Sequence, residues 1–165
     1  MASEKKVKDV MIALEDYPHI PYWFTLNQAV IIVREAAIKF EGSFEPRAVL
    51  VFDEKYWLVG ILTLKDILRG LEGDMLAGPE GAALTWQDLV GPALTERAQK
   101  QVSDVMSPLG VTLDSSDSLV TALAVMLQEN LERIPVLENQ KVVGLIRLAD
   151  LFQEISGVLL AGQPQ

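Results

Sequence analysis

The chain has 165 residues, half of them hydrophobic and 22% charged, so it can fold around a core and is not disordered. Fourteen Lys and Arg against twenty-three Asp and Glu give a net charge of −9, which argues against general nucleic-acid binding. With no cysteine and the single histidine His19, the sequence excludes disulfides, thiol nucleophiles and the usual Cys/His zinc site.

The acidic charge is uneven along the chain. Residues 1–71 carry nine basic and ten acidic residues, a net of −1, whereas residues 72–165 carry five and thirteen, a net of −8. An anionic ligand is therefore bound more easily by the first part. Because no apolar run reaches the ~20 residues that span a bilayer and no secretory-type stretch follows the N-terminus, we expect a cytoplasmic protein without membrane contact.

The first 71 residues predict a helix, a hairpin and a second helix. Thr25 and Gln28 have the spacing of a capping box before a helix over 26–40, and Gly42-Ser43 and Pro46 end it. In chain order we expect a short helix or turn over 7–14, an irregular segment through 18–21, that helix, strands over 47–53 and 56–62, and a helix over 64–71. Trp57 is expected to pack beneath a helix.

The remaining residues predict a connector and a second set of similar elements. Glycine and proline punctuate residues 72–101, where we expect helical turns over 85–90 and 94–101, and where Trp86 suits a partner surface. After them we expect an extended piece over 111–113, a helix over 119–129 capped by Ser118 or Asp117, strands over 134–137 and 141–146, and a helix over 148–155.

The same motifs occur twice, in the same order. The pairs are 7–11 (VKDVM) with 102–106 (VSDVM), 47–51 (RAVLV) with 133–137 (RIPVL), and 60–66 (GILTLKD) with 144–150 (GLIRLAD). We interpret the chain as repeat 1 over 1–71, a connector over 72–101, repeat 2 over 102–156 and a tail over 157–165. The expected fold class is α/β (α+β), with two β-α-β-β-α repeats packed pseudo-symmetrically as one module.

Two such motif sets resemble a tandem pair of CBS domains. The resemblance implies binding of an adenosine-containing ligand (AMP, ADP, ATP or S-adenosylmethionine) in the clefts between the repeats, and regulation of a partner protein. It further implies ribose and phosphate contacts from Gly60, Thr63 and Asp66. On the adenine side it implies His19, Ile20, Ala48 and Val49. In repeat 2 it implies Arg147 and Asp150, which stand at the positions of Thr63 and Asp66.

The residues themselves support this reading and also a plainer one. Thr63 stands where a strand meets a helix, so its hydroxyl and the free amides of the first turn suit a phosphate, and Asp66 suits ribose hydroxyls. The same spacing of Thr63 and Asp66 forms a capping box that needs no ligand. Arg147, which replaces the hydroxyl in repeat 2, can pair with a phosphate or with Asp150, or remain solvated. We expect one competent site, on repeat 1.

The expected function is that of a regulatory module, not an enzyme, with neither metal nor cofactor. The alternative is a structural or interaction module with degenerate, ligand-free sites. Signalling is expected through an unknown effector protein or a homodimer. The expected dimer surface comprises Ile67, Leu68, Leu71, Leu151, Phe152 and Ile155.

Overall fold

The computed structural model describes residues 4–39, 47–79 and 81–162 and divides the chain into two compact units. Unit 1 consists of residues 1–17 and 110–165, and unit 2 consists of residues 18–109. The units do not follow the sequence repeats, because the first segment of each repeat packs with the body of the other. Val7 lies fully buried in the core of unit 1, and Val102 lies fully buried in the core of unit 2. Burial of these two valines holds the exchanged segments in place.

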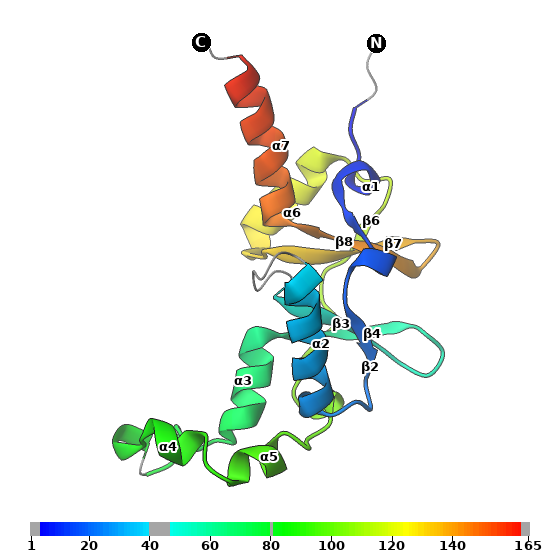
Figure 1. The fold of residues 1–165 in the computed structure, drawn as a ribbon. Coiled ribbons are helices and arrows are strands. Elements are labelled where there is room, and N and C mark those ends of the chain that lie inside the picture. The colour runs from blue at the N-terminus through cyan, green and yellow to red at the C-terminus, as the bar shows by residue number, and fades with distance from the viewer. Residues whose placement is uncertain (1–3, 40–46, 80, 163–165) are drawn as a thin grey trace. The chain divides into compact units, whose positions relative to one another are not determined.

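Unit 2 is built on a four-stranded mixed sheet in the order β2-β3-β4-β5. Strands β2 and β3 are parallel, and β3–β4 and β4–β5 are antiparallel. Helices α2 and α3 lie side by side (Figure 1). The elements are β2 His19–Pro21, α2 Leu26–Lys39, β3 Ala48–Phe52, β4 Leu58–Thr63, α3 Leu64–Glu72 and β5 Ser107–Pro108.

The predicted capping box of α2 is present. The amide of Thr25 donates to the Gln28 side chain at 2.9 Å, and the amide of Gln28 donates to Thr25 Oγ1 at 3.2 Å. From this start, Leu26, Ala29 and Val33 point into a core that also includes β3 and β4. The expected end of the helix at residues 40–46 lies outside the described residues.

The predicted connector packs against the C-terminal end of α3. It contains η2 Gly81–Ala83, α4 Trp86–Leu89 and α5 Ala93–Arg97, and η3 Val102–Asp104 follows it at the start of repeat 2. The guanidinium of Arg97 donates to the carbonyls of Leu71 and Leu89, and Lys100 Nζ donates to the carbonyl of Gly70 at 3.0 Å. Cationic side chains at a helix C-terminus donate hydrogen bonds to its free carbonyls and interact favourably with the negative end of the helix dipole. The connector is thus part of unit 2.

Unit 1 repeats the same arrangement with a sheet in the order β1-β8-β7-β6. Ser118 Oγ accepts from the amide of Thr121 at 3.1 Å and so caps α6, as expected, and Asn130 ends that helix with a φ of 55°. The elements are α1 Val7–Val10, β1 Ile12–Ala13, η1 Leu14–Asp16, β6 Leu113–Asp114, α6 Leu119–Glu129, β7 Arg133–Glu138, β8 Lys141–Arg147 and α7 Leu148–Ala161.

Some local predictions were wrong. The short helix or turn expected over 7–14 is a helix only as far as Val10, because residues 12–13 form a strand paired with β8. The segment expected to be irregular contains β2, which pairs with β3. The second strand of the hairpin begins at Leu58 rather than at Tyr56, whose φ of 66° is incompatible with an extended strand. Trp57 therefore lies in the turn and is 40% exposed instead of packing beneath a helix.

Candidate ligand-binding site

At the junction of β4 and α3, Thr63 and Asp66 are joined by a reciprocal pair of hydrogen bonds. The amide of Asp66 donates to Thr63 Oγ1 at 3.0 Å, and the amide of Thr63 donates to Asp66 Oδ2 at 3.0 Å. This is the capping box that the spacing predicted. It also holds a carboxylate and a hydroxyl together at the N-terminus of a nine-residue helix.

Asp66 has a further partner that the sequence did not reveal. Ser107 Oγ donates to the Asp66 carboxylate, lying 3.0 Å from Oδ2 and 3.2 Å from Oδ1. Strand β5 brings Ser107 there by pairing with β4, where Ser107 faces Ile61. Asp66 is only 5% exposed. A carboxylate accepts about four hydrogen bonds, so the amide of Thr63 and the hydroxyl of Ser107 leave part of its capacity unused.

Gly60 is needed for the pairing of β4 with β5. A Cβ at this position would lie 2.6 Å from the carbonyl oxygen of Ser107 and 2.8 Å from the sulfur of Met106. The absence of a side chain therefore lets β5 approach β4, and this approach delivers Ser107 to Asp66. Gly144 has the same relation to Ile12 and Met11 in unit 1, where the distances are 2.3 and 2.9 Å.

The four residues expected on the adenine side do not form one exposed surface. Ile20 and Val49 are core residues of unit 2 and present no side chain to a ligand. Ala48 is also buried, but it is the strand partner of Thr63 and so lies beside the junction. His19 is partly exposed and packs edge-on against Phe52, with ring centroids 5.6 Å apart, and against the Tyr56 ring.

The junction of β8 and α7 in unit 1 has different chemistry. Arg147 Nη2 donates to Asp150 Oδ1 at 2.8 Å, and the Arg147 amide donates to Asp150 Oδ2 at 2.8 Å. Of the three possibilities left open for Arg147, the structure shows the ion pair with Asp150. The strand position that corresponds to Ser107 is occupied by Ile12, which faces Leu145. Only half of the capping box remains, since arginine has no acceptor.

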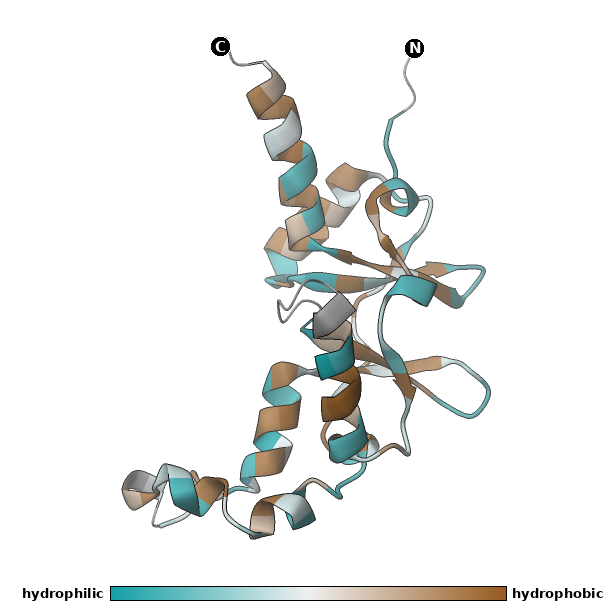
Figure 2. Cartoon of the chain, in the orientation of Figure 1, coloured by the Kyte–Doolittle hydropathy of each residue, from teal (hydrophilic) through white to brown (hydrophobic). Residues whose placement is uncertain are grey.

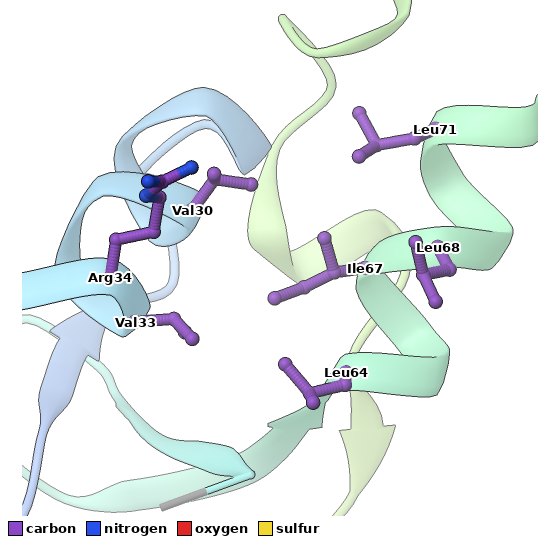
Figure 3. Close-up of a pocket in the computed structure, with 7 residues that line it drawn as sticks. All are labelled: Val30, Val33, Arg34, Leu64, Ile67, Leu68 and Leu71. Carbon is purple, nitrogen blue, oxygen red and sulfur yellow. The ribbon is translucent and has the colours of Figure 1, made fainter. Parts of the chain in front are cut away.

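An apolar groove of about 410 Å³ runs between α2 and α3 in unit 2 (Figure 3). Its base includes the buried Val33 and Ile67, and Leu68, which is 64% exposed, stands at its edge. The remaining lining residues are Val30, Arg34, Leu64 and Leu71. With a single charged side chain, this groove suits an apolar partner and not a nucleotide.

Two of the residues expected on a dimer surface are core residues. Ile67 is 5% exposed and Leu151 is 3% exposed, so both pack mainly within their own chain, and Ile67 also lines the base of the groove. Leu68, Phe152 and Ile155 are exposed as expected. Apolar residues continue along α7 to its end, as the brown segments of that helix show (Figure 2).

Among the described residues there is no group of three or more His, Cys, Asp or Glu side chains that could hold a metal ion. In the same part of the chain, no helix is long and apolar enough to cross a membrane.

Sequence comparison identifies a family for the second repeat. Residues 102–157 match the family model of the CBS domain. The uncharacterized protein YlbB of Bacillus subtilis (strain 168) is 27% identical over 147 residues, which make up 88% of this chain and 79% of YlbB. Arabinose 5-phosphate isomerase GutQ of Salmonella typhi is 30% identical over 106 residues, 64% of this chain but only 26% of that longer protein.

Solved structures extend the likeness to both units. A CBS domain-containing protein of Bacillus anthracis has a TM-score of 0.70 at 21% identity and covers 93% of this chain and 94% of its own. CBSX2 of Arabidopsis thaliana has a TM-score of 0.69 at 19% identity, covering 96% and 99%. CBSX2 has also been solved in complex with AMP, with a TM-score of 0.65 at 17% identity, covering 93% and 98%.

A further match is the CBS domain pair of protein MJ0100, solved in complex with 5′-methylthioadenosine and S-adenosyl-L-methionine. It has a TM-score of 0.63 at 20% identity and covers 94% of this chain and 99% of its own. At these identities the structures establish the fold. The chain therefore has the fold of a CBS-domain pair, and its residues 102–157 match the CBS domain by sequence.

Proposed function

We propose that this chain is a regulatory module that binds an adenosine-containing ligand at the β4–α3 junction of unit 2. The ligand class comprises AMP, ADP, ATP and S-adenosylmethionine. One observation carries the proposal: Asp66 is a buried carboxylate with spare acceptor capacity, held beside the hydroxyls of Thr63 and Ser107 at a helix N-terminus.

The chemistry of this junction suits both parts of a nucleotide. A ribose hydroxyl donates to the Asp66 carboxylate, which is the role that an acidic residue has in dinucleotide-binding folds. A phosphate is favoured near the first turn of α3, where the helix dipole and amide groups attract anions. The exposed Lys65 in this turn adds a positive charge.

The comparisons support this ligand class. CBSX2 has been solved with AMP, and the CBS pair of MJ0100 with 5′-methylthioadenosine and S-adenosyl-L-methionine. These ligands share an adenosine group and differ in what is attached to its 5′ carbon. The recognition of ribose by Asp66 is the part of the proposal that applies to all of them.

Isothermal titration calorimetry with AMP, ADP, ATP and S-adenosylmethionine tests the proposal. We expect the wild type to bind one of the four, and Asp66→Asn to weaken that binding by at least about tenfold, because a charge-assisted hydrogen bond to the ribose is lost. Asp88→Asn is the matched control, since Asp88 forms the same capping box with Thr85 at the start of α4. If Asp66→Asn binds as tightly as the wild type, the site is wrongly placed.

The signal is proposed to pass through a homodimer or an effector protein in the cytoplasm. The apolar groove between α2 and α3, with Leu68 at its edge, supports a protein contact on unit 2. The exposed Phe152, Ile155 and Val158 of α7 support one on unit 1. A ligand that binds at the start of α3 shifts such contacts only by its difference in affinity between the two states.

A second candidate is an interaction module without ligand. The ion pair between Arg147 and Asp150 favours it for unit 1, because the carboxylate there is already neutralised by a guanidinium. The absence of heat with all four ligands, in a protein with an intact fold, would decide for this candidate.

A further inference from the structure

Ser107 reaches the candidate site from the segment that the two repeats exchange. Its hydroxyl lies 41 positions away from Asp66 in sequence and hydrogen-bonds the carboxylate, 3.0 Å from Oδ2 and 3.2 Å from Oδ1. The Thr63 amide holds Oδ2 from the other side. Two donors from two different strands therefore fix the plane of one nearly buried carboxylate.

The corresponding junction of unit 1 shows what happens without this hydroxyl. Ile12 takes the register position of Ser107, one residue beyond the methionine that ends each Asp-Val-Met segment. Asp150 is instead paired with the guanidinium of Arg147. Both hydroxyls of the first junction are thus replaced in the second, and the remaining carboxylate is neutralised by a cation rather than held by neutral donors.

This difference matters for recognition of a sugar. A carboxylate that is held by neutral donors keeps its negative charge available and accepts strongly from a ligand hydroxyl. A carboxylate engaged in a close ion pair has its charge and much of its acceptor capacity occupied. An aligned acceptor that lies almost out of water also discriminates strongly against a ligand that lacks the matching hydroxyl.

We propose that Ser107 is a positioning residue for ligand selectivity: it orients the Asp66 carboxylate so that this site selects ribose over deoxyribose. The inference rests on the proposed function of the β4–α3 junction. It assigns the selectivity to the exchanged segment, outside the repeat that carries Thr63 and Asp66. Unit 1, with Ile12 and Arg147, has no such selectivity.

The test compares Ser107→Ala with wild type, Asp66→Asn and the double variant by calorimetry. The probes are the best binder among AMP, ADP, ATP and S-adenosylmethionine, together with its 2′-deoxy and 3′-deoxy forms. We expect the wild type to bind the ribose form on the order of tenfold more tightly than at least one deoxy form. We expect Ser107→Ala to lose most of this ratio, and the double variant to bind like Asp66→Asn alone.

Several results would overturn the inference. If Ser107→Ala binds the ligand as tightly as the wild type and with the same ribose-to-deoxyribose ratio, the role of Ser107 is rejected. The proposed site at Asp66 is unaffected by that result. If the double variant's loss of affinity equals the product of the losses in Ser107→Ala and Asp66→Asn, Ser107 acts independently of Asp66 and the inference is wrong. Equal binding of the ribose and deoxyribose forms by the wild type would reject the inference, even if Ser107→Ala fails to fold. A wild type that binds none of the four ligands would reject the proposed function as well.

Discussion

Replacing Gly60 with alanine tests the strand pairing that builds the site. Gly60 lies in β4 opposite Pro108, and its Cβ would stand 2.6 Å from a backbone oxygen and 2.8 Å from a side-chain sulfur. The backbone oxygen belongs to Ser107 and cannot rotate away, so β5 must move. Overpacking of this kind costs about 1–3 kcal/mol. Displacing Ser107 from Asp66 adds roughly 1 kcal/mol for a lost hydrogen bond.

The expected loss for Gly60→Ala is therefore about 2–4 kcal/mol in the free energy of unfolding. For a chain of this length it corresponds to a fall in Tm of roughly 4–16 °C. Differential scanning calorimetry and urea unfolding measure it. Gly157→Ala is the control, because a Cβ there meets nothing within 4 Å and the residue lies inside α7, so alanine should stabilise by about 0.5–1 kcal/mol. A Gly60→Ala variant as stable as the wild type would refute the pairing of β5 with β4.

Three further predictions concern the surface, the connector and pH. Leu68→Asp should dissociate the proposed homodimer, as measured by analytical ultracentrifugation of both proteins, with little change in Tm because Leu68 is 64% exposed. The same mass for variant and wild type would exclude the groove as a dimer contact. Arg97→Ala should make residues 72–101 more sensitive to limited proteolysis, since it removes hydrogen bonds to the carbonyls of Leu71 and Leu89; unchanged cleavage would argue against this anchor. The backbone amide and then the hydroxyl of Thr85 lower the pKa of Asp88, so its contribution to stability is present above its unfolded pKa and is lost as the pH falls through the lower folded pKa. NMR titration should show that Thr85→Ala raises the pKa of Asp88, and an unmoved pKa would contradict the role of the hydroxyl.

The parts of the fold that depend on local chemistry were predicted from the sequence. The capping boxes at Thr25 and Thr63 are defined within four residues, and both are present. The cap of α6 by Ser118 is present for the same reason. The hairpins were identified from apolar runs on either side of a turn, with boundaries displaced where Tyr56 adopts a positive φ.

The parts that depend on distant contacts were not predicted. The exchange of segments rests on the burial of Val7 and Val102 in cores formed mostly by other regions of the sequence. Two-residue strands such as β5 have no periodicity to detect, so the contact between Ser107 and Asp66 had no local signal. The difference between Ser107 and Ile12 after the repeated methionine was visible, but its meaning depended on the strand register.

The candidate site shows the same division. Thr63 and Asp66 were placed together correctly, because their spacing fixes the geometry at a helix start. For Arg147 the sequence left three possibilities open, since a guanidinium can pair with a phosphate or a carboxylate equally well; the structure shows the pair with Asp150. Ile20 was expected beside the ligand from the resemblance; its side chain lies in the core of unit 2, and its contact with a ligand stays a prediction.

A crystal structure of the chain with the best-binding adenosine ligand tests the central claim most directly. We predict that a ribose hydroxyl lies within hydrogen-bonding distance of the Asp66 carboxylate, with Ser107 still donating to the same group, and that Asp150 keeps its pair with Arg147. Ligand density at the Asp150 junction alone, or only in the apolar groove beside Leu68, would contradict the claim.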